Sequence, residues 1–499
     1  MHPSRRDSRS LALLTDLYQL TMAYGYWSAS KVEEEAVFHL FFRENPFEGG
    51  YAIAAGLEQA IDYLDGFRFT GPDLDDLREI RGGNDERLFP DEFIDYLGNL
   101  KLTCDIDAVP EGTVVFPHEP LLRVRGPILQ AQLLETTLLN LINFQTLIAT
   151  KAARVVLAAA GSPVLDFGLR RAQGVDGGIS ASRAAYIGGC AGTSNVLAGA
   201  MYGIPMKGTH AHSWVMAFDS ELESFEKYAE VMPGNSLLLV DTYDTLDGVA
   251  NAIVVARKLR AAGHELMGIR LDSGDLAWLS IEARKMLDEA GFENVKIAAS
   301  NDLDEHIITS LLQQGARIDI WGVGTRLITA FDQPALGGVY KLTAIRQPGG
   351  AWEHKIKLSE QAIKISNPGI LQVRRFFVDG EAAGDMICSE DIPEPARTIV
   401  DPLDLTRRKR FDVGAKTEDL LVPIFRGGRR VYDPPSLDEI RARRERELAR
   451  FHPGIKRLVH PHRYPVGLEE KLFELKTRLV LEARNRTKRH GTHSLETGR

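Results

Sequence analysis

The sequence predicts an α/β protein: an irregular TIM-like α/β barrel with an N-terminal mixed α/β domain and a C-terminal extension. Beyond residue 160, six short apolar segments alternate with helix-forming segments, which is the pattern of repeated parallel β-α units. Polar residues follow most of the apolar segments, as they do where the strands of a barrel terminate. With 499 residues, 44% of them hydrophobic, the chain has enough material for two or three packed domains.

Residues 1–130 are expected to form the N-terminal α/β domain, completed by C-terminal segments. The aromatic-rich run EAVFHLFFR at 35–43 predicts a strand, and residues 56–66 predict a helix. Between 104 and 127, Val-rich runs broken by Pro and Gly indicate several short strands.

Residues 131–345 are expected to form the barrel. A helix-forming stretch with few breakers covers 128–160. The segments that we expect to be strands with their following loops are 164–168, 195–203, 236–245, 267–275, 296–304 and 318–325.

Residues 346–499 form the third predicted region, which we expect to pack on the N-terminal domain and to end in a basic helical tail. The arginine runs at 407–410 and 441–450 are interpreted as solvated helix faces with compensating Glu. No low-complexity linker separates the regions, so packed domains are expected.

Composition excludes several classes of protein. A net charge of −9 and a pI near 5.9 argue against nucleic acid or an anionic membrane as the main partner. Three widely spaced cysteines fit neither a disulfide framework nor a cysteine zinc site. Because we identify neither a signal peptide nor an apolar run long enough to span a membrane, we expect a cytoplasmic protein that binds small molecules.

Two strand-end motifs suit a sugar phosphate. Asp272 and Asp275, after Arg270, offer carboxylates to vicinal hydroxyls, although acidic turns are also common helix N-caps. The small residues of Gly322-Val323-Gly324-Thr325 expose backbone N–H groups that suit a phosphate, although an ordinary strand-to-helix turn looks the same. Together the motifs predict a sugar phosphate across the barrel mouth.

A third motif, DFGLRR at 166–171, suits a planar acid. Phe167 can stack on a flat ring, and Arg170 can pair with a carboxylate or phosphate. The alternative is a core Phe beside surface arginines in ion pairs.

The stretch GTHAHSW at 208–214 places two histidines two residues apart. A metal clip requires further ligands at later strand ends, whereas His264 and His306 fall in helical or turn segments. The sequence thus favours two other interpretations of His210 and His212: a structural pair, or a phosphoryl acceptor, since imidazole is a nucleophile at neutral pH.

Taken together, these motifs resemble the nicotinate phosphoribosyltransferase family. The matching stretches run in order from the N-terminus to about residue 370, and no motif beyond about 460 is matched. They are LLTDLYQLTMAYGYW (13–27), FHLFFRENPFEGGYAIAAGLE (38–58), DFGLRRAQGVDGGISAS (166–182), GTSNVLAGAMYGIPMKGTHAHSW (192–214), RLDSGDL (270–276), SNDLDE (300–305), GVGTRLIT (322–329) and LGGVYKL (336–342).

The resemblance implies a reaction in NAD salvage: nicotinate and 5-phosphoribosyl-1-pyrophosphate give nicotinate mononucleotide and pyrophosphate, coupled to ATP hydrolysis. It also implies the type II phosphoribosyltransferase fold and a homodimer whose active sites are shared across subunits. Mg²⁺ and the co-substrate ATP are expected, without an organic prosthetic group.

By position, the resemblance assigns roles to individual residues. His212 is the expected phosphohistidine, acting with Arg270 and with Asp272, which is also the candidate Mg²⁺ ligand. The expected nicotinate site comprises Phe167, Ser194, Arg170 or Arg270, and Tyr18 of the partner subunit with Asp16 nearby. The expected ligands of the phosphoribosyl group are Asp275, Ser300, Asn301, Gly322, Gly324, Thr325, Gly208 and Thr209, and the expected clamps for pyrophosphate or ATP are Arg43, Lys357 and Lys364.

The stretch Gly192-Thr193-Ser194 favours nicotinate over its amide. Nicotinamide-using relatives carry an acidic residue where this chain has Ser194, and a carboxylate there would repel that of nicotinate. The alternatives are a nicotinamide or quinolinate phosphoribosyltransferase, a metal-dependent barrel hydrolase and a non-catalytic scaffold.

Overall fold

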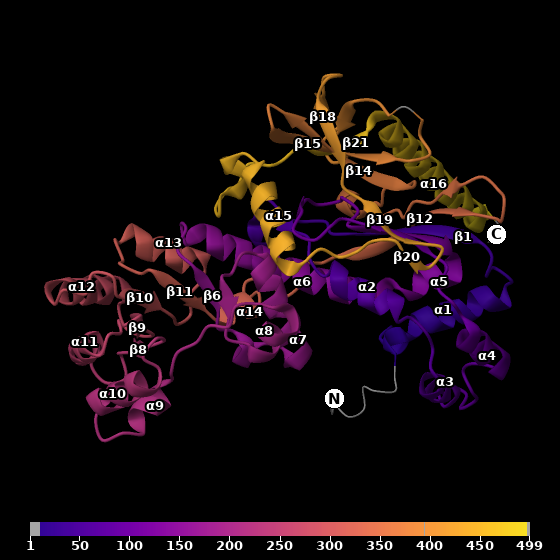
Figure 1. The fold of residues 1–499 in the computed structure, drawn as a ribbon. Coiled ribbons are helices and arrows are strands. Elements are labelled where there is room, and N and C mark those ends of the chain that lie inside the picture. The colour runs from indigo at the N-terminus through magenta and orange to yellow at the C-terminus, as the bar shows by residue number, and fades with distance from the viewer. Residues whose placement is uncertain (1–9, 394, 497–499) are drawn as a thin grey trace. The chain divides into compact units, whose positions relative to one another are not determined.

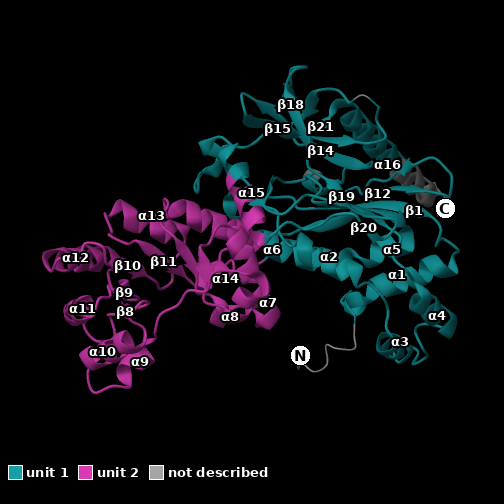
Figure 2. Cartoon of the chain, in the orientation of Figure 1, with its two compact units in different colours: residues 1–146, 335–436, 446–499 teal, residues 147–334, 437–445 magenta. Residues whose placement is uncertain are grey.

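The computed structural model describes residues 10–393 and 395–496. By its contacts the chain divides into two compact units, which are coloured separately in Figure 2. Unit 1 comprises residues 1–146, 335–436 and 446–499, and unit 2 comprises residues 147–334 and 437–445. In chain order, therefore, the main part of unit 2 is inserted into unit 1.

Unit 1 contains an antiparallel seven-stranded sheet around β1 (Glu35–Phe41). The predicted strand at 35–43 is thus confirmed; its apolar and aromatic side chains are buried, and it pairs with β12 and β5. In order, the sheet contains β13 (Glu353–His354), β12 (Val339–Arg346), β1, β5 (Leu122–Pro127), β3 (Asp105–Ala108), β19 (Val422–Arg426) and β20 (Arg429–Arg430).

A second sheet of six strands is formed by the C-terminal region. Its order is β17 (Arg408–Arg410), β16 (Thr398–Val400), β21 (Val466–Glu469), β15 (Glu381–Ser389), β14 (Leu371–Val378) and β18 (Lys416–Asp419). A two-stranded ribbon pairs β2 (Ala52–Ile53) with β4 (Val114–Val115).

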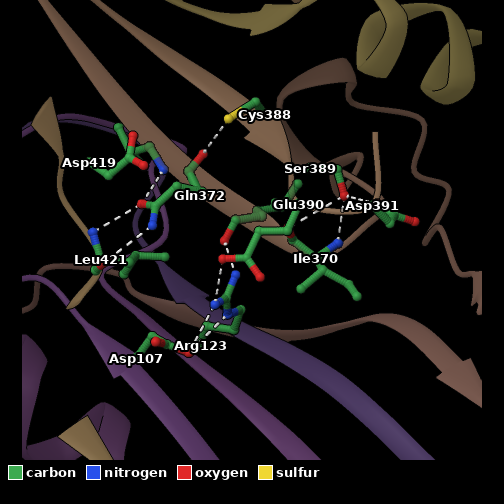
Figure 3. Close-up of polar contacts among 12 residues, drawn as sticks. Asp107, Arg123, Ile370, Gln372, Cys388, Ser389, Glu390, Asp391, Asp419 and Leu421 are labelled. Carbon is green, nitrogen blue, oxygen red and sulfur yellow. Dashed lines mark hydrogen bonds and ion pairs between the residues drawn. The ribbon is translucent and has the colours of Figure 1, made fainter. Parts of the chain in front are cut away.

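The buried cation Arg123 links the two large sheets of unit 1 (Figure 3). Its guanidinium binds Asp107 at 2.9 Å on the neighbouring strand and Glu390 at 2.8 Å, just beyond β15. It also donates to the carbonyl of Leu371 in β14 at 3.0 Å. Because a buried charge is costly unless paired, this set of partners fixes how the sheets pack.

Unit 1 also contains helices, some of which lie against its sheets (Figure 1). They are α1 (Leu17–Ser28), α2 (Leu57–Asp65), α3 (Gly71–Arg78), α4 (Asp91–Asn99), α5 (Ile128–Leu133) and α16 (Glu470–Glu496). Two more helices cross the boundary between the units along the chain, α6 (Glu135–Ala158) and α15 (Leu437–Ala449).

Unit 2 contains a six-stranded parallel sheet with helices outside it (Figure 1). The strand order is β7 (Gly192–Thr193), β6 (Val164–Asp166), β11 (Ile320–Val323), β10 (Lys296–Ala299), β9 (Gly268–Leu271) and β8 (Leu237–Leu239). The helices are α7 (Gly174–Ile187), α8 (Val196–Tyr202), α9 (His212–Met216), α10 (Glu221–Val231), α11 (Thr245–Ala261), α12 (Leu276–Glu289), α13 (Glu305–Gln313) and α14 (Thr325–Ile328).

The segment 205–210 lies between the two edge strands of this sheet. On one side, the Thr193 amide of β7 donates to Pro205 and the Lys207 amide donates back to Thr193. On the other side, the Thr209 hydroxyl donates to the carbonyl of Leu237 in β8 at 2.6 Å. A segment without regular ladder pairing thereby closes the sheet, and the predicted irregular α/β barrel is confirmed.

Two local predictions were wrong, and a third was only partly right. Residues 195–203 form helix α8, because Asn195 caps its start and Gly203 ends it in the left-handed region at φ 70°. The run 407–410 contributes to strand β17 instead of a helix. The run 441–450 is helical but only partly solvated, because Arg444 and Glu447 are buried and Glu447 binds Arg375.

Among the described residues, one helix, α6, is long and apolar enough to cross a membrane. In the folded protein 72% of the most apolar stretch of this helix is buried, as expected for a core helix.

Candidate active site

Three polar side chains form a network at the strand ends of unit 2. Arg270 ends β9 and donates from Nε to Ser300 Oγ at 2.7 Å and from Nη2 to Asp272 Oδ1 at 2.9 Å. Ser300 also hydrogen-bonds to Asp272. The carboxylate and guanidinium thus hold each other in fixed orientations.

This network keeps Asp272 ionised. Burial by itself disfavours the carboxylate, but the Ser300 hydrogen bond and the Arg270 charge outweigh it and lower the pKa of Asp272 below its usual value. The Asp272 side chain remains 26% exposed, so a ligand can reach its second oxygen.

A second carboxylate, Asp241, positions the loop that carries Asp272. Its Oδ2 accepts the Asp272 amide at 2.8 Å and the Ser273 hydroxyl at 2.7 Å. Its buried Oδ1 has no partner among the described residues. An unpaired buried oxygen is costly, so Asp241 has one position available for a ligand.

His212 is the first residue of α9 and faces the same network. Its Nδ1 lies 3.1 Å from Thr242 Oγ1, and its Nε2 lies 3.7 Å from Asp272 Oδ2. The ring is 40% exposed. When Nδ1 carries the proton and donates a hydrogen bond to Thr242 Oγ1, Nε2 keeps its lone pair and can act as a nucleophile.

Phe167 lies beside this network because two glycines make room for its turn. A Cβ on Gly322 would lie 2.6 Å from the Phe167 ring, and one on Gly168 would lie 2.4 Å from Ile328. The Arg270 guanidinium lies 5.8 Å from the centre of the Phe167 ring. An aromatic face and a cation therefore stand side by side, as a planar acid requires.

Hydrogen bonds of Asp166 fix the backbone of the Phe167 turn. Asp166 is buried and accepts the Gly168 amide at 2.9 Å and the hydroxyls of Ser182 and Thr193, each at 2.8 Å. Burial raises its pKa although these bonds favour the charged form. Asp166 therefore positions the turn instead of facing a ligand.

A mostly apolar cavity of about 240 Å³ runs into the barrel from this site. Phe167, Arg270 and Gly322 line it, together with small residues such as Ala298. The interior of a TIM-like barrel is usually filled by branched side chains. Here part of the interior is open, and this cavity has room for a ring stacked on Phe167.

The remaining sequence-predicted residues of unit 2 differ in what they contact. Asp275 caps α12 by accepting a hydrogen bond from the Trp278 amide, so for this residue the structure shows the N-cap that was the alternative to ribose binding. Asn301 has a positive φ of 114° and is exposed.

Arg170 and Ser194 are exposed near the Phe167 turn, and Gly324 with Thr325 starts the short helix α14. Gly208 and Thr209 belong to the segment that closes the barrel.

Unit 1 brings Tyr18 and Asp16 together with two residues that sequence reasoning missed, Glu135 and Lys341. Asp16 caps α1 and binds the Thr136 hydroxyl at 2.8 Å. Burial and the neighbouring Glu135 raise the pKa of Tyr18. Tyr18 is half exposed, so its ring is available to a ligand or a partner.

A group of cations adjoins them in unit 1. Burial lowers the pKa of Lys341, Glu135 opposes this shift, and the charges of Lys357 and Arg43 add to it. Arg43 Nε is buried without a partner among the described residues. Lys364 is exposed at the end of a short 3₁₀ helix (Ala362–Lys364).

The group extends to two further positions that sequence reasoning missed. Burial lowers the pKa of His118 to about 4, helped by the charges of Lys476, Arg43 and Arg463. Burial also lowers the pKa of Lys476 to about 8, although its ammonium donates to Asn367 Oδ1 at 2.8 Å. We call Arg43, Lys341, Lys357, Lys476 and Arg463 the cation group.

Within residues 10–393 and 395–496, no cluster of three or more His, Cys, Asp and Glu side chains is arranged to hold a metal ion. The protein ligand set that a metal-dependent barrel hydrolase requires is therefore not found in this part of the chain.

Comparison with known families agrees with this arrangement. Models of the nicotinate phosphoribosyltransferase N-terminal domain, family and C-terminal domain match residues 13–143, 163–363 and 371–476. The chain belongs to the nicotinate phosphoribosyltransferase family. The family resemblance expected from the motifs is thereby confirmed, and it extends well beyond residue 370.

Individual relatives match over nearly the whole chain. The nicotinate phosphoribosyltransferase of Bacillus subtilis is 45% identical and covers 96% of each chain; the human protein is 36% identical and covers 93% of this chain and 95% of its own. The crystal structure of human nicotinic acid phosphoribosyltransferase superposes with a TM-score of 0.81 at 33% identity, covering 93% of this chain and 99% of that one. A nicotinate-nucleotide pyrophosphorylase structure from Pyrococcus furiosus, 23% identical with a TM-score of 0.65, shares the fold.

Proposed function

We propose that this protein forms nicotinate mononucleotide and pyrophosphate from nicotinate and 5-phosphoribosyl-1-pyrophosphate, and that ATP drives the reaction through phosphorylation of His212. The supporting observation is that Phe167, Arg270, Asp272 and His212 converge on one end of the barrel. The family relatives named above carry the same activity in their names.

Nicotinate is proposed to stack on Phe167 in the barrel cavity, with its carboxylate facing Arg270 or Arg170. The ring nitrogen needs no general base, because it carries no proton at neutral pH. Its lone pair forms the bond to ribose C1 while the bond from C1 to the pyrophosphate oxygen breaks. The ionised Asp272 stabilises the positive charge that develops on the ribose.

ATP is proposed to phosphorylate His212 at Nε2. The Nε2 lone pair attacks the γ-phosphorus, the P–N bond forms, the P–O bond to ADP breaks, and the proton remains on Nδ1, hydrogen-bonded to Thr242 Oγ1. Water later cleaves the P–N bond and releases phosphate. The added negative charge beside Asp272 orders the pyrophosphate subsite for substrate and relaxes on hydrolysis.

Asp272 and Asp241 suit a magnesium ion. Hard cations prefer carboxylate oxygens together with substrate phosphates, and the unpartnered Asp241 Oδ1 is such an oxygen. Bound there, Mg²⁺ would neutralise charge on the departing pyrophosphate.

We further propose a homodimer in which unit 1 of one subunit completes the site of the other. Two sets of exposed apolar side chains support this: Leu14, Leu17 and Met22 around α1, and Val196, Leu197 and Met201 on α8. Patches of this kind mark interfaces. Tyr18 would then cover the second face of nicotinate, and the cation group would bind pyrophosphate and ATP phosphates.

The acid is preferred to the amide because Ser194 is neutral and exposed where a carboxylate would repel nicotinate. Replacing Ser194 by Asp should lower kcat/KM for nicotinate about tenfold or more and leave that for nicotinamide unchanged or higher. A cytoplasmic location is expected, since Cys104, Cys190 and Cys388 are all free thiols.

The decisive experiment measures pyrophosphate release with nicotinate, 5-phosphoribosyl-1-pyrophosphate and Mg²⁺, with and without ATP. We expect release with nicotinate, and ATP stimulation in the wild type only. The His212→Ala variant should keep slow ATP-independent transfer and lose the stimulation. Unchanged stimulation in that variant would remove the phosphohistidine from the proposal, and absence of release would remove the activity itself.

A further inference from the structure

The second histidine of the GTHAHSW stretch, His210, is not explained by the reaction. It is 8% exposed, and its ring packs edge-on against Tyr228 of α10 with centroids 4.8 Å apart. The contacts of its ring are with backbone groups and with aromatic side chains, and it makes no hydrogen bond to Arg270, Asp272 or Ser300 in the described part of the chain.

The contacts of the two ring nitrogens of His210 define its tautomer. The Leu239 amide donates to His210 Nε2 at 3.2 Å, so Nε2 must be unprotonated. The proton is then on Nδ1, which faces the Ala211 carbonyl at 3.4 Å. Burial lowers the pKa of His210 to about 4, in agreement with a neutral ring.

The accepted N–H belongs to an edge strand. Strand β8 pairs with β9 on one side only, so its outer backbone groups need other partners. Thr209 satisfies the Leu237 carbonyl, and His210 satisfies the Leu239 amide. Two consecutive side chains thus replace the missing neighbouring strand.

The two histidines contact the same short stretch. His210 binds the backbone at Leu239, and His212 approaches the side chain of Thr242, three residues further on. Their contacts set the register of segment 208–212 against segment 237–242. A shift at His210 would move the His212 ring away from Thr242 and Asp272.

We propose that His210 is a positioning residue for the phosphorylation of His212: its neutral imidazole accepts the edge N–H of Leu239 and holds His212 between Thr242 and Asp272. The inference rests on the proposed function of His212. It assigns His210 no contact with substrate.

Two variants separate hydrogen bonding from packing. His210→Phe keeps a flat ring against Tyr228 but has no acceptor, and leaves a buried N–H unpaired. His210→Gln places an acceptor oxygen where Nε2 lies. His264→Phe, at an exposed histidine, is the matched control.

The readouts are acid-labile phosphohistidine formed with ATP and the rate of ATP-independent transfer. His210→Phe should slow phosphorylation about tenfold, as expected for loss of a buried hydrogen bond, and leave ATP-independent transfer unchanged. His210→Gln should recover most of the phosphorylation rate, and His264→Phe should match the wild type. Equal phosphorylation in wild type and His210→Phe, or no recovery in His210→Gln, overturns the inference.

The outcome for His212→Ala separates this inference from the proposed function. If that variant loses ATP stimulation while His210→Phe behaves as wild type, only the role of His210 is wrong. Because His210→Phe is buried and can impair folding, ¹⁵N NMR of the wild-type enzyme provides a second test. A proton on Nδ1 and none on Nε2 of His210 supports the inference, and a proton on Nε2 overturns it.

Discussion

The strand ends of unit 2 and the cation group of unit 1 are both strongly polar, but the cation group is the less completely compensated, with Glu135 near Lys341 and Asp401 paired with Arg463 at 3.3 Å. Arg270 donates to Ser300 at 2.7 Å and to Asp272 at 2.9 Å, and Asp241 fixes the loop that carries Asp272. In unit 1, Lys341 lies near Lys357 and Arg43, and Arg43 Nε has no partner among the described residues.

This difference indicates two kinds of binding. A compensated network is preorganised, so it can stabilise developing charge without rearranging. An excess of cations instead raises the free energy of the unliganded protein through mutual repulsion, and a bound anion reduces this repulsion. Variants of the Arg270, Asp272 and Ser300 network are therefore expected to affect the chemical step, and variants of the cation group to affect anion binding.

The largest effect is expected from Asp272→Asn. The amide of Asn is neutral, so it cannot form an ion pair with Arg270 or stabilise positive charge on the ribose. The kcat for pyrophosphate release should therefore fall about 10² to 10³-fold. The unfolding temperature is the control for general damage. A loss below about tenfold would mean that the network is structural.

The next effect is expected from Phe167→Ala. Losing the stacking face should raise KM for nicotinate about tenfold, with a smaller change in KM for 5-phosphoribosyl-1-pyrophosphate. Steady-state kinetics with each substrate varied in turn measures both constants. Equal changes in the two would place Phe167 outside the nicotinate site.

A smaller effect concerns anion binding in unit 1. Pyrophosphate should raise the unfolding temperature of the wild type by a few degrees, because it neutralises the cation group. Arg43→Ala should reduce this shift, whereas Arg407→Ala, at an exposed arginine paired with Asp404, should not. Identical shifts in all three proteins would show that the cation group does not bind the anion.

The smallest effect is a pH dependence from Lys476. Burial lowers its pKa in the folded protein to about 8 from 10.5, so between pH 8 and 10.5 the unfolded state binds more protons. Stability attributable to this group therefore rises with pH in that window, while pyrophosphate affinity falls as the ammonium loses its charge. Lys476→Met should flatten both profiles, which thermal unfolding and calorimetric titration with pyrophosphate measure.

The sequence predicted the elements that depend on local pattern. The buried strand at 35–43 and the strands before Phe167, Asp272 and Gly324 are there because apolar runs are bounded by turn residues. Residues 195–203 were assigned wrongly because their caps, Asn195 and Gly203, outweigh an apolar run that suits either structure.

The contacts of the site were less predictable, since they depend on residues distant in sequence. Asp241 follows the apolar run of β8, but its bond to the Asp272 amide depends on the fold. Lys476 follows no motif; only the folded chain brings its charge near His118. The contact of His210 with the Leu239 amide is likewise one that no sequence pattern reveals.

The insertion of unit 2 into unit 1 also determines the order in which the chain can fold during synthesis. Strand β1 gains its partner β12 late: Thr343 and Val37, which hydrogen-bond across them, are 306 residues apart. Throughout translation of the barrel, one apolar edge of β1 lacks its native neighbour and is open to pairing with other nascent chains. Slowing the ribosome between residues 147 and 334 should therefore increase aggregation, and chaperones that shield strand edges should reduce it.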